Sequence, residues 1–166
     1  MKVYIGFSKP NSFNPFASLI EFVEARPYDH AYIKVQEPAN RTWMIFQASG
    51  LVVNLITEVR FLNNHVSLKE YEIDINASQY MDLWNYINSS LGIPYSLIED
   101  FGILLMKIFK LKNQPFNQGM SAEFCSKLGA SVCNLLGIAM PEDVSDIDPT
   151  TLDSILASKG FPYVET

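Results

Sequence analysis

Hydrophobic and polar residues alternate with a period of two in the first half of the chain. Lys2–Ser8 places Val3, Ile5 and Phe7 on one face of a strand and ends at turn-forming residues. The same alternation returns in four later segments, which we predict as strands: His30–Gln36, Thr42–Ser49, Leu51–Thr57 and Val66–Ile75. These four segments follow one another closely, as the strands of an antiparallel meander do.

The period changes to that of an amphipathic helix on either side of this meander. Five segments have this spacing: Phe16–Val23, Ser78–Leu91, Ile98–Leu111, a helix that begins near Ala122–Cys125, and a helix that begins at Pro149. Asn76 and Gln79 have the spacing of a capping box, and Asp148 is a suitable N-cap for the last helix. That helix ends at Gly160, before a short predicted strand at Phe161–Val164. The order of one strand, one helix, a meander and then helices predicts an α+β fold.

Length and composition indicate one folded domain. The chain has 166 residues, of which 48% are hydrophobic and 18% are charged. A chain of this length is able to build a sizeable core, and its low charge excludes a disordered protein. We therefore expect residues 1–166 to form a single domain.

The net charge of −6 is unevenly distributed along the chain. Leu128–Ser158 contains no basic residue, and its acidic residues carry five of the six excess negative charges: Glu142, Asp143, Asp146, Asp148 and Asp153. The rest of the chain has nearly equal numbers of acidic and basic residues, so it offers no broad cationic surface for phosphates. We expect no nucleic-acid partner.

The sequence contains two cysteines, Cys125 and Cys133. They form no CxxC pair, so neither a disulfide-rich scaffold nor a zinc ribbon is available, and we expect no metal or other cofactor. Cys125 opens a predicted helix, whose N–H groups and positive dipole end favour a thiolate and hence a nucleophile. A buried core thiol is the alternative for Cys125. Cys133 lies among Val132, Leu135 and Leu136 and is interpreted as a core residue.

Two histidines are candidates for a proton acceptor. His30 starts a predicted strand, and its alternative is a surface histidine paired with Asp29. Gln47 is a polar residue in the next, apolar strand; if the two strands pair, its side chain reaches the imidazole of His30 and holds one tautomer. Otherwise Gln47 is a buried glutamine that satisfies its own hydrogen bonds. His65 lies in a predicted turn and is expected to be solvated.

Four short motifs follow the N-terminal strand and helix in a characteristic order. They are Tyr28-Asp29-His30-Ala31-Tyr32-Ile33, Phe46-Gln47-Ala48-Ser49-Gly50-Leu51-Val52, Gly92-Ile93-Pro94-Tyr95-Ser96 and Glu123-Phe124-Cys125-Ser126. From about Phe7 to Phe161 this order resembles the circularly permuted branch of the NlpC/P60 papain-like hydrolases, in which the histidine and its polar partner precede the nucleophilic cysteine. The resemblance implies an antiparallel β-sheet or half-barrel packed against helices. It also implies a catalytic triad of Cys125, His30 and Gln47.

The activity implied by the resemblance is that of a cysteine peptidase or amidase. His30 takes the proton of Cys125, the thiolate attacks a carbonyl, and water resolves the thioester. The backbone N–H of Cys125 is the expected oxyanion donor, with a second donor near Tyr28 or Tyr95. Many members of the branch carry a glutamate where this chain has Gln47. An amide orients the imidazole but does not stabilise an imidazolium by charge, so a weakly active enzyme or a non-catalytic virion or interaction module is an alternative.

The substrate implied by the resemblance is a peptide or another amide, most often a cell-wall peptide. A lipid is the alternative, because acyltransferases and phospholipases of the lecithin–retinol acyltransferase type resemble the same permuted arrangement. Phe101–Leu111, followed by Lys112, is then a helix on a membrane surface; otherwise it is a core helix. The N-terminus lacks the features of a secretion signal, and no apolar stretch is long enough to cross a bilayer. We expect a cytoplasmic or virion-associated protein, with peripheral membrane contact under the lipid alternative.

Overall fold

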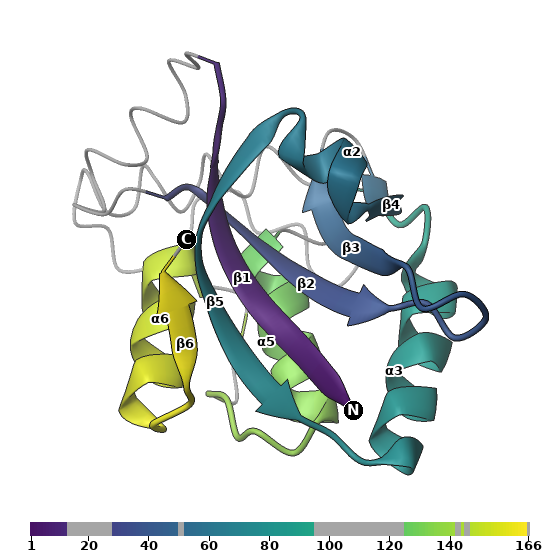
Figure 1. Ribbon diagram of the computed structural model, residues 1–166. Coiled ribbons are helices and arrows are strands. Elements are labelled where there is room, and N and C mark those ends of the chain that lie inside the picture. Colours follow the sequence, from purple (N-terminus) through teal and green to yellow (C-terminus); the bar gives the residue numbers. More distant parts are fainter. Residues whose placement is uncertain (13–27, 50–51, 95–124, 142–143, 145–146, 166) are drawn as a thin grey trace.

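A six-stranded antiparallel sheet forms the centre of the protein (Figure 1). The structure is a computed structural model that describes residues 1–12, 28–49, 52–94, 125–141, 144 and 147–165. The strands are β1 (Lys2–Pro10), β2 (His30–Gln36), β3 (Trp43–Ser49), β4 (Val52–Thr57), β5 (His65–Asp74) and β6 (Tyr163–Glu165). They lie in the order β4-β3-β2-β1-β5-β6, and each neighbouring pair is antiparallel.

The helices of the described residues are α2 (Glu58–Leu62), α3 (Ala77–Ser90), α5 (Cys125–Leu135) and α6 (Pro149–Ser158). α3 begins with the predicted capping box, in which the side chains of Asn76 and Gln79 each accept a hydrogen bond from the other residue's backbone N–H. α6 begins at Pro149, behind the N-cap Asp148. Both helix starts follow the sequence signals that predicted them.

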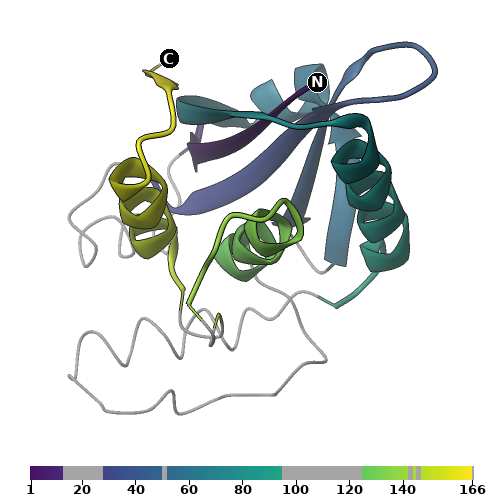
Figure 2. The same cartoon turned by 90° about the horizontal axis from the view of Figure 1, so that it is seen from below.

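The two faces of the sheet are covered by different helices (Figures 1 and 2). α3, α5 and α6 pack on one face, here called the three-helix face, and α2 lies on the other, the α2 face. The three-helix face carries most of the core, including Val3, Ile5, Phe7, Ala31, Ile33, Val35, Phe46, Ala48, Tyr71, Leu83, Ile87, Leu128, Val132, Leu152 and Leu156. The α2 face carries a small buried cluster of Tyr32, Ile45 and Phe61. The large apolar area on the three-helix face makes it the main source of hydrophobic stabilisation.

Strand alternation determines which residues reach the α2 face. In β2, Ala31, Ile33 and Val35 contribute to the three-helix core, so His30 and Tyr32 point to the α2 face. The ring of Tyr32 lies against Gly6 of β1: a Cβ atom on Gly6 would meet the ring at 2.1 Å. A glycine is therefore required at position 6 for this aromatic ring to fit.

The predicted α+β layout is confirmed, and the five longer strands and the helix after them occur within two residues of their predicted bounds. The short final strand occurs at Tyr163–Glu165 rather than Phe161–Val164. α2 was not predicted, because five residues are too few to show a helical period. Its start depends on Thr57, whose side chain accepts a hydrogen bond from the N–H of Arg60.

Two predicted helices, Phe16–Val23 and Ile98–Leu111, lie outside the described residues. The second of these is the segment on which the lipid alternative depends. In the part of the chain that the structure describes, no helix has the length and apolarity needed to span a membrane.

Candidate functional site

Two of the three predicted triad residues lie together on the α2 face. His30 is the first residue of β2, and Gln47 lies on the neighbouring strand β3. The Nε2 atom of His30 is 2.8 Å from the Oε1 atom of Gln47, a normal hydrogen-bond distance. The imidazole is half-buried, and the glutamine is buried. The two strands therefore bring the amide to the imidazole, as the sequence predicts.

A second amide, Asn54 of β4, determines how Gln47 is oriented. The Nδ2 atom of Asn54 donates to the carbonyls of Ser49 at 3.1 Å and Val52 at 3.3 Å, and a carbonyl only accepts. The Oδ1 atom of Asn54 consequently faces Gln47, whose Nε2 donates to it at 3.3 Å. This leaves the Oε1 of Gln47 to accept from His30, so the neutral imidazole carries its proton on Nε2 and a lone pair on Nδ1.

Aromatic rings pack beside the imidazole. The ring centroid of His65 is 5.6 Å from that of His30, and the ring of Phe61 stacks on His65 at 4.4 Å. Burial, and to a smaller extent the neighbouring His65, lower the pKa of His30 to about 4, against the opposing effect of the hydrogen bond to Gln47. Burial also lowers the pKa of His65. At neutral pH His30 is therefore an uncharged proton acceptor.

The shifted pKa of His30 predicts a dependence of stability on pH. The imidazole takes up a proton near pH 6.5 in the unfolded chain but only near pH 4 in the folded protein. Between these values the unfolded state binds more protons, so stability is complete above pH 6.5 and is lost as the pH falls toward 4. The loss due to His30 reaches about 3 kcal/mol. Urea unfolding measured across this range should show a larger loss in the wild type than in His30→Gln, in which His65, whose pKa is also lowered, still contributes; equal slopes would contradict the shift.

Cys125, the third predicted triad residue, is the first residue of α5 and is 5% exposed. It precedes Leu128 by three residues and Val132 by seven, so it lies on the side of the helix that packs against the sheet. The hydroxyl of Ser126 donates to the carbonyl of Ile147 and attaches this end of the helix to the segment before α6. The thiol is therefore held at the start of a packed helix, on the three-helix face.

Cys133 lies two turns further along the same helix. It is fully buried in the three-helix core, and burial raises the pKa of its thiol to about 12. Since the thiolate is the reactive form, Cys133 is chemically inert at neutral pH.

The C-terminal ends of α5 and β2 lie close together. The side chain of Gln79 donates to the carbonyl of Leu136, just after α5, and the hydroxyl of the adjacent Tyr80 donates to the carbonyl of Gln36, the last residue of β2. The first residue of α5 is about 15 Å back along the helix. α5 therefore begins toward the opposite end of the sheet, where β2 also begins (Figure 1).

Cys125 and His30 thus share an end of the sheet but lie on opposite faces. The described partners of His30 are Gln47, Phe61 and His65. Within the described ranges, no hydrogen bond joins the Cys125 thiol to the imidazole. A contact between the two would have to form around the end of the sheet at which β2 begins.

A cavity of about 450 Å³ opens on the α2 face beside His65. On its wall, Lys34 pairs with Glu58 at 2.7 Å and with Glu70 at 3.1 Å. Two carboxylates for one ammonium give this wall a net charge of −1. Because His65 also stacks on His30, the cavity provides space for a ligand next to the candidate proton acceptor. Among the residues that the structure describes, no group of three histidine, cysteine or acidic side chains could hold a metal ion.

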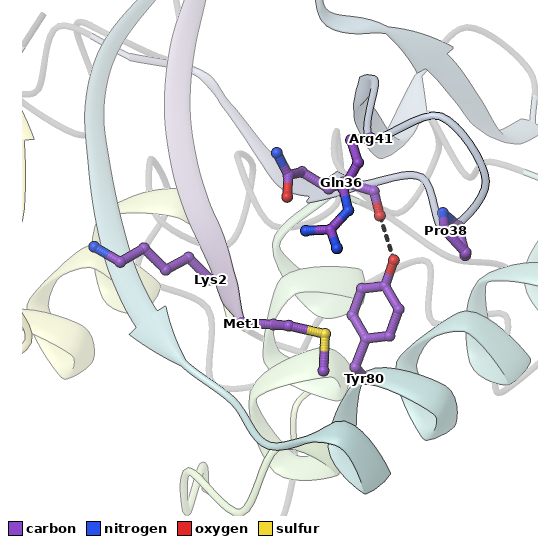
Figure 3. A pocket seen from close by; sticks show the side chains of 6 residues that line it. All are labelled: Met1, Lys2, Gln36, Pro38, Arg41 and Tyr80. Carbon is purple, nitrogen blue, oxygen red and sulfur yellow. Dashed lines mark hydrogen bonds between the residues drawn. The ribbon is translucent and has the colours of Figure 1, made fainter.

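A smaller cavity, of about 120 Å³, lies at the other end of the sheet (Figure 3). Met1, Gln36, Arg41 and Tyr80 line it, and the Tyr80 hydroxyl points at the carbonyl of Gln36, 2.7 Å away. Gln36 is six residues from His30, or about 20 Å along β2. This cavity is therefore separate from the candidate site.

His65 and Asn54 have places in the site that the sequence did not predict. The prediction that His65 is solvated in a turn is wrong: it is the half-buried first residue of β5, stacked on Phe61. Asn54 was missed, although it carries the same signal as Gln47, a polar residue within an apolar strand. The β3–β4 register places these two amides directly opposite each other.

The second oxyanion donor was expected near Tyr28 or Tyr95. The hydroxyl of Tyr28 is buried and donates to the carboxylate of Asp153 at 2.6 Å. Tyr95 lies outside the described residues. The described part of the chain therefore supplies an orienting amide for the imidazole, while the donor near Tyr95 stays a prediction.

The chain was compared with protein-family models and with curated proteins. No protein-family model matches the chain, and no curated protein matches it. Three features of the molecule bear on its function: a neutral imidazole held by an amide, a cysteine at the start of a packed helix, and the location of both at one end of the sheet.

Proposed function

We propose that the protein is a thiol-dependent hydrolase of the papain-like, circularly permuted NlpC/P60 type, which cleaves an amide bond in a peptide. Cys125 is the nucleophile, His30 accepts its proton, and Gln47 orients the imidazole. The observation that carries the proposal is the 2.8 Å hydrogen bond between His30 Nε2 and Gln47 Oε1. It leaves Nδ1 with a lone pair, as a general base requires. Cys125 lies at the same end of the sheet but on its other face, so the proposed proton transfer requires the thiol and the imidazole to meet around that end.

In the proposed reaction, Nδ1 of His30 takes the proton of the Cys125 thiol while the sulfur attacks the carbonyl carbon of the substrate. The backbone N–H groups at the start of α5 donate to the oxyanion that forms. The imidazolium returns its proton to the departing amine, which leaves a thioester on Cys125. A water molecule, deprotonated by His30, then hydrolyses the thioester and restores the thiol.

The surroundings of His30 affect how fast such a reaction runs. Burial holds the pKa of the imidazole at about 4, and Gln47 supplies an oriented dipole rather than a negative charge. A stable imidazolium–thiolate pair is therefore disfavoured, and the proton moves only as the sulfur attacks. We expect a slower enzyme than one with a glutamate at position 47.

A second candidate function is that of an interaction module without turnover. The observation that favours it is the orientation of His30, which points to the α2 face and is packed beside Phe61 and His65. On this account the cavity beside His65 binds a partner, and the bond between His30 and Gln47 only stabilises the sheet. The reactivity of the Cys125 thiol distinguishes the two candidates.

The test is the pH dependence of alkylation at Cys125. In a Cys133→Ala protein, Cys125 is the single thiol, and its rate of reaction with iodoacetamide is followed by mass spectrometry. A hydrolase should show a half-maximal rate below pH 8, because the helix terminus favours the thiolate and the neutral His30 takes the thiol proton as the sulfur attacks. In His30→Gln the half-maximal rate should move to higher pH, because the proton acceptor is gone.

The matched control is a Cys125→Ala protein, in which Cys133 alone remains. Its alkylation should be negligible throughout the neutral range, because burial raises the pKa of that thiol to about 12. If Cys125 proves as unreactive as Cys133 in the folded protein, the hydrolase proposal fails and the interaction module is the better description.

A further inference from the structure

A chain of amide hydrogen bonds extends beyond the candidate triad to a residue that the mechanism has not used. The chain runs from His30 through Gln47 to Asn54, with separations of 2.8 and 3.3 Å. It ends on the backbone carbonyls of Ser49, the last residue of β3, and Val52, the first residue of β4. Only this end of the chain has a fixed hydrogen-bonding direction, since a carbonyl oxygen accepts and never donates.

The two carbonyls at this end determine which group donates and which accepts in every other hydrogen bond of the chain. The amide group of a glutamine is nearly symmetric in shape, so turning Gln47 over exchanges its oxygen and nitrogen with little change in packing. If Gln47 were turned over, its Nε2 would donate to the imidazole, and Nε2 of His30 would have to become the acceptor. The proton would then reside on Nδ1, and the lone pair would lie on Nε2, where it accepts from Gln47 and is not available to the thiol.

We propose that Asn54 is a positioning residue that fixes the proton of His30 on Nε2 by holding Gln47 in one of its two amide orientations. The Oδ1 of Asn54 accepts a hydrogen bond from Gln47 when the Nε2 of Gln47 faces β4. If Gln47 were turned over, its Oε1 would face the Oδ1 of Asn54, and two acceptor oxygens would lie opposite each other without a proton between them. The tautomer itself does not depend on any enzymatic activity. That this tautomer serves to accept the thiol proton on Nδ1 rests on the proposed function.

The test is the tautomer of His30 in protein labelled with ¹⁵N-histidine. The two ring nitrogens of a neutral imidazole have different ¹⁵N chemical shifts, and the chain has only two histidines, so a His65→Gln protein assigns the signals. At pH 7 we expect the wild type to show the proton on Nε2. In Asn54→Leu the ratio of the two tautomers should fall by about tenfold, the effect of one hydrogen bond of ordinary strength.

Two further variants separate positioning from a merely structural role. Asn54→Asp keeps an acceptor for Gln47 but loses the donors to Ser49 and Val52, so it should restore the wild-type tautomer even though the β3–β4 connection is weakened. Gln47→Glu presents only oxygens to His30, so adding Asn54→Leu to it should leave the tautomer unchanged.

The proposal is overturned if folded Asn54→Leu keeps the wild-type tautomer ratio, or if Asn54→Asp shifts it as much as Asn54→Leu does. Folding is checked in each variant from its amide spectrum. The result is independent of the alkylation test: an unreactive Cys125 would end the hydrolase proposal and leave the tautomer measurement valid.

Discussion

Alanine in place of Cys125 or of His30 should each reduce amide hydrolysis by at least about a thousandfold, because the two residues act as one unit in forming the attacking thiolate. The measurement is the release of amine from a panel of short peptide amides, with cell-wall-type dipeptides included. Gln47→Ala should have a smaller effect, since the imidazole would keep access to the productive tautomer for part of the time.

Cys133→Ala is the matched control for this prediction. It removes the other thiol of the same helix, from a fully buried position in the core, and it should leave the activity largely intact. Full activity in Cys125→Ala would falsify the mechanism. If Cys133→Ala lost as much activity as Cys125→Ala, the loss would come from disturbing the helix and not from removing the thiol at its start.

The largest expected loss of stability comes from Asp153, on the three-helix side of the protein. Its carboxylate is 2% exposed and accepts hydrogen bonds from the hydroxyls of Tyr28 at 2.6 Å and Tyr71 at 2.7 Å, and from the ammonium of Lys69 at 2.7 Å. Replacing Asp153 by alanine removes this carboxylate from all three donors, one of them charged, and leaves Tyr71 with its longer bond of 3.3 Å to the backbone carbonyl of position 153. We expect the free energy of unfolding to fall by about 3–5 kcal/mol.

Chemical denaturation of Asp153→Ala and of a matched control tests this expectation. Asp82, an exposed aspartate of α3, is the control, and Asp82→Ala should change the free energy of unfolding by no more than about 0.5 kcal/mol. Lys69→Met removes one donor and leaves the two tyrosine hydroxyls bonded, so its effect should be smaller than that of Asp153→Ala. A loss below about 1 kcal/mol in Asp153→Ala would show that the three donors find other acceptors.

Most of the fold could be predicted because its elements are long and regular. A strand such as Lys2–Pro10 shows several alternations, and α3 carries its capping box in the sequence. The five residues of α2 show neither a full period nor a strong breaker, so this helix depends on the packing of Phe61 against Tyr32 and Ile45. That packing is a tertiary effect, and no local pattern contains it.

The site could be predicted in part for the same reason. Chain order and neighbouring strands were enough to pair His30 with Gln47, and the parity of strand positions puts Gln47 opposite Asn54. Parity also puts His30 on the same face as Tyr32. Which face the helices cover is decided by the packing of the whole chain, so the separation of His30 and Cys125 across the sheet could not be read from the sequence.

The place of β1 in the sheet has a consequence for how the chain folds. β1 lies between β2 and β5, and its register pairs Lys2 with Asp74 and Val3 with Ile73. During synthesis about seventy further residues must therefore be made before β5 is complete and can pair with this edge of β1. The helices that cover the buried face of β1 are made later still. Contacts so distant in sequence slow folding, because a long loop must close before the pairing is gained. The protein should therefore fold late on the ribosome, and β1, whose Val3, Ile5 and Phe7 are fully buried in the folded protein, needs protection until then.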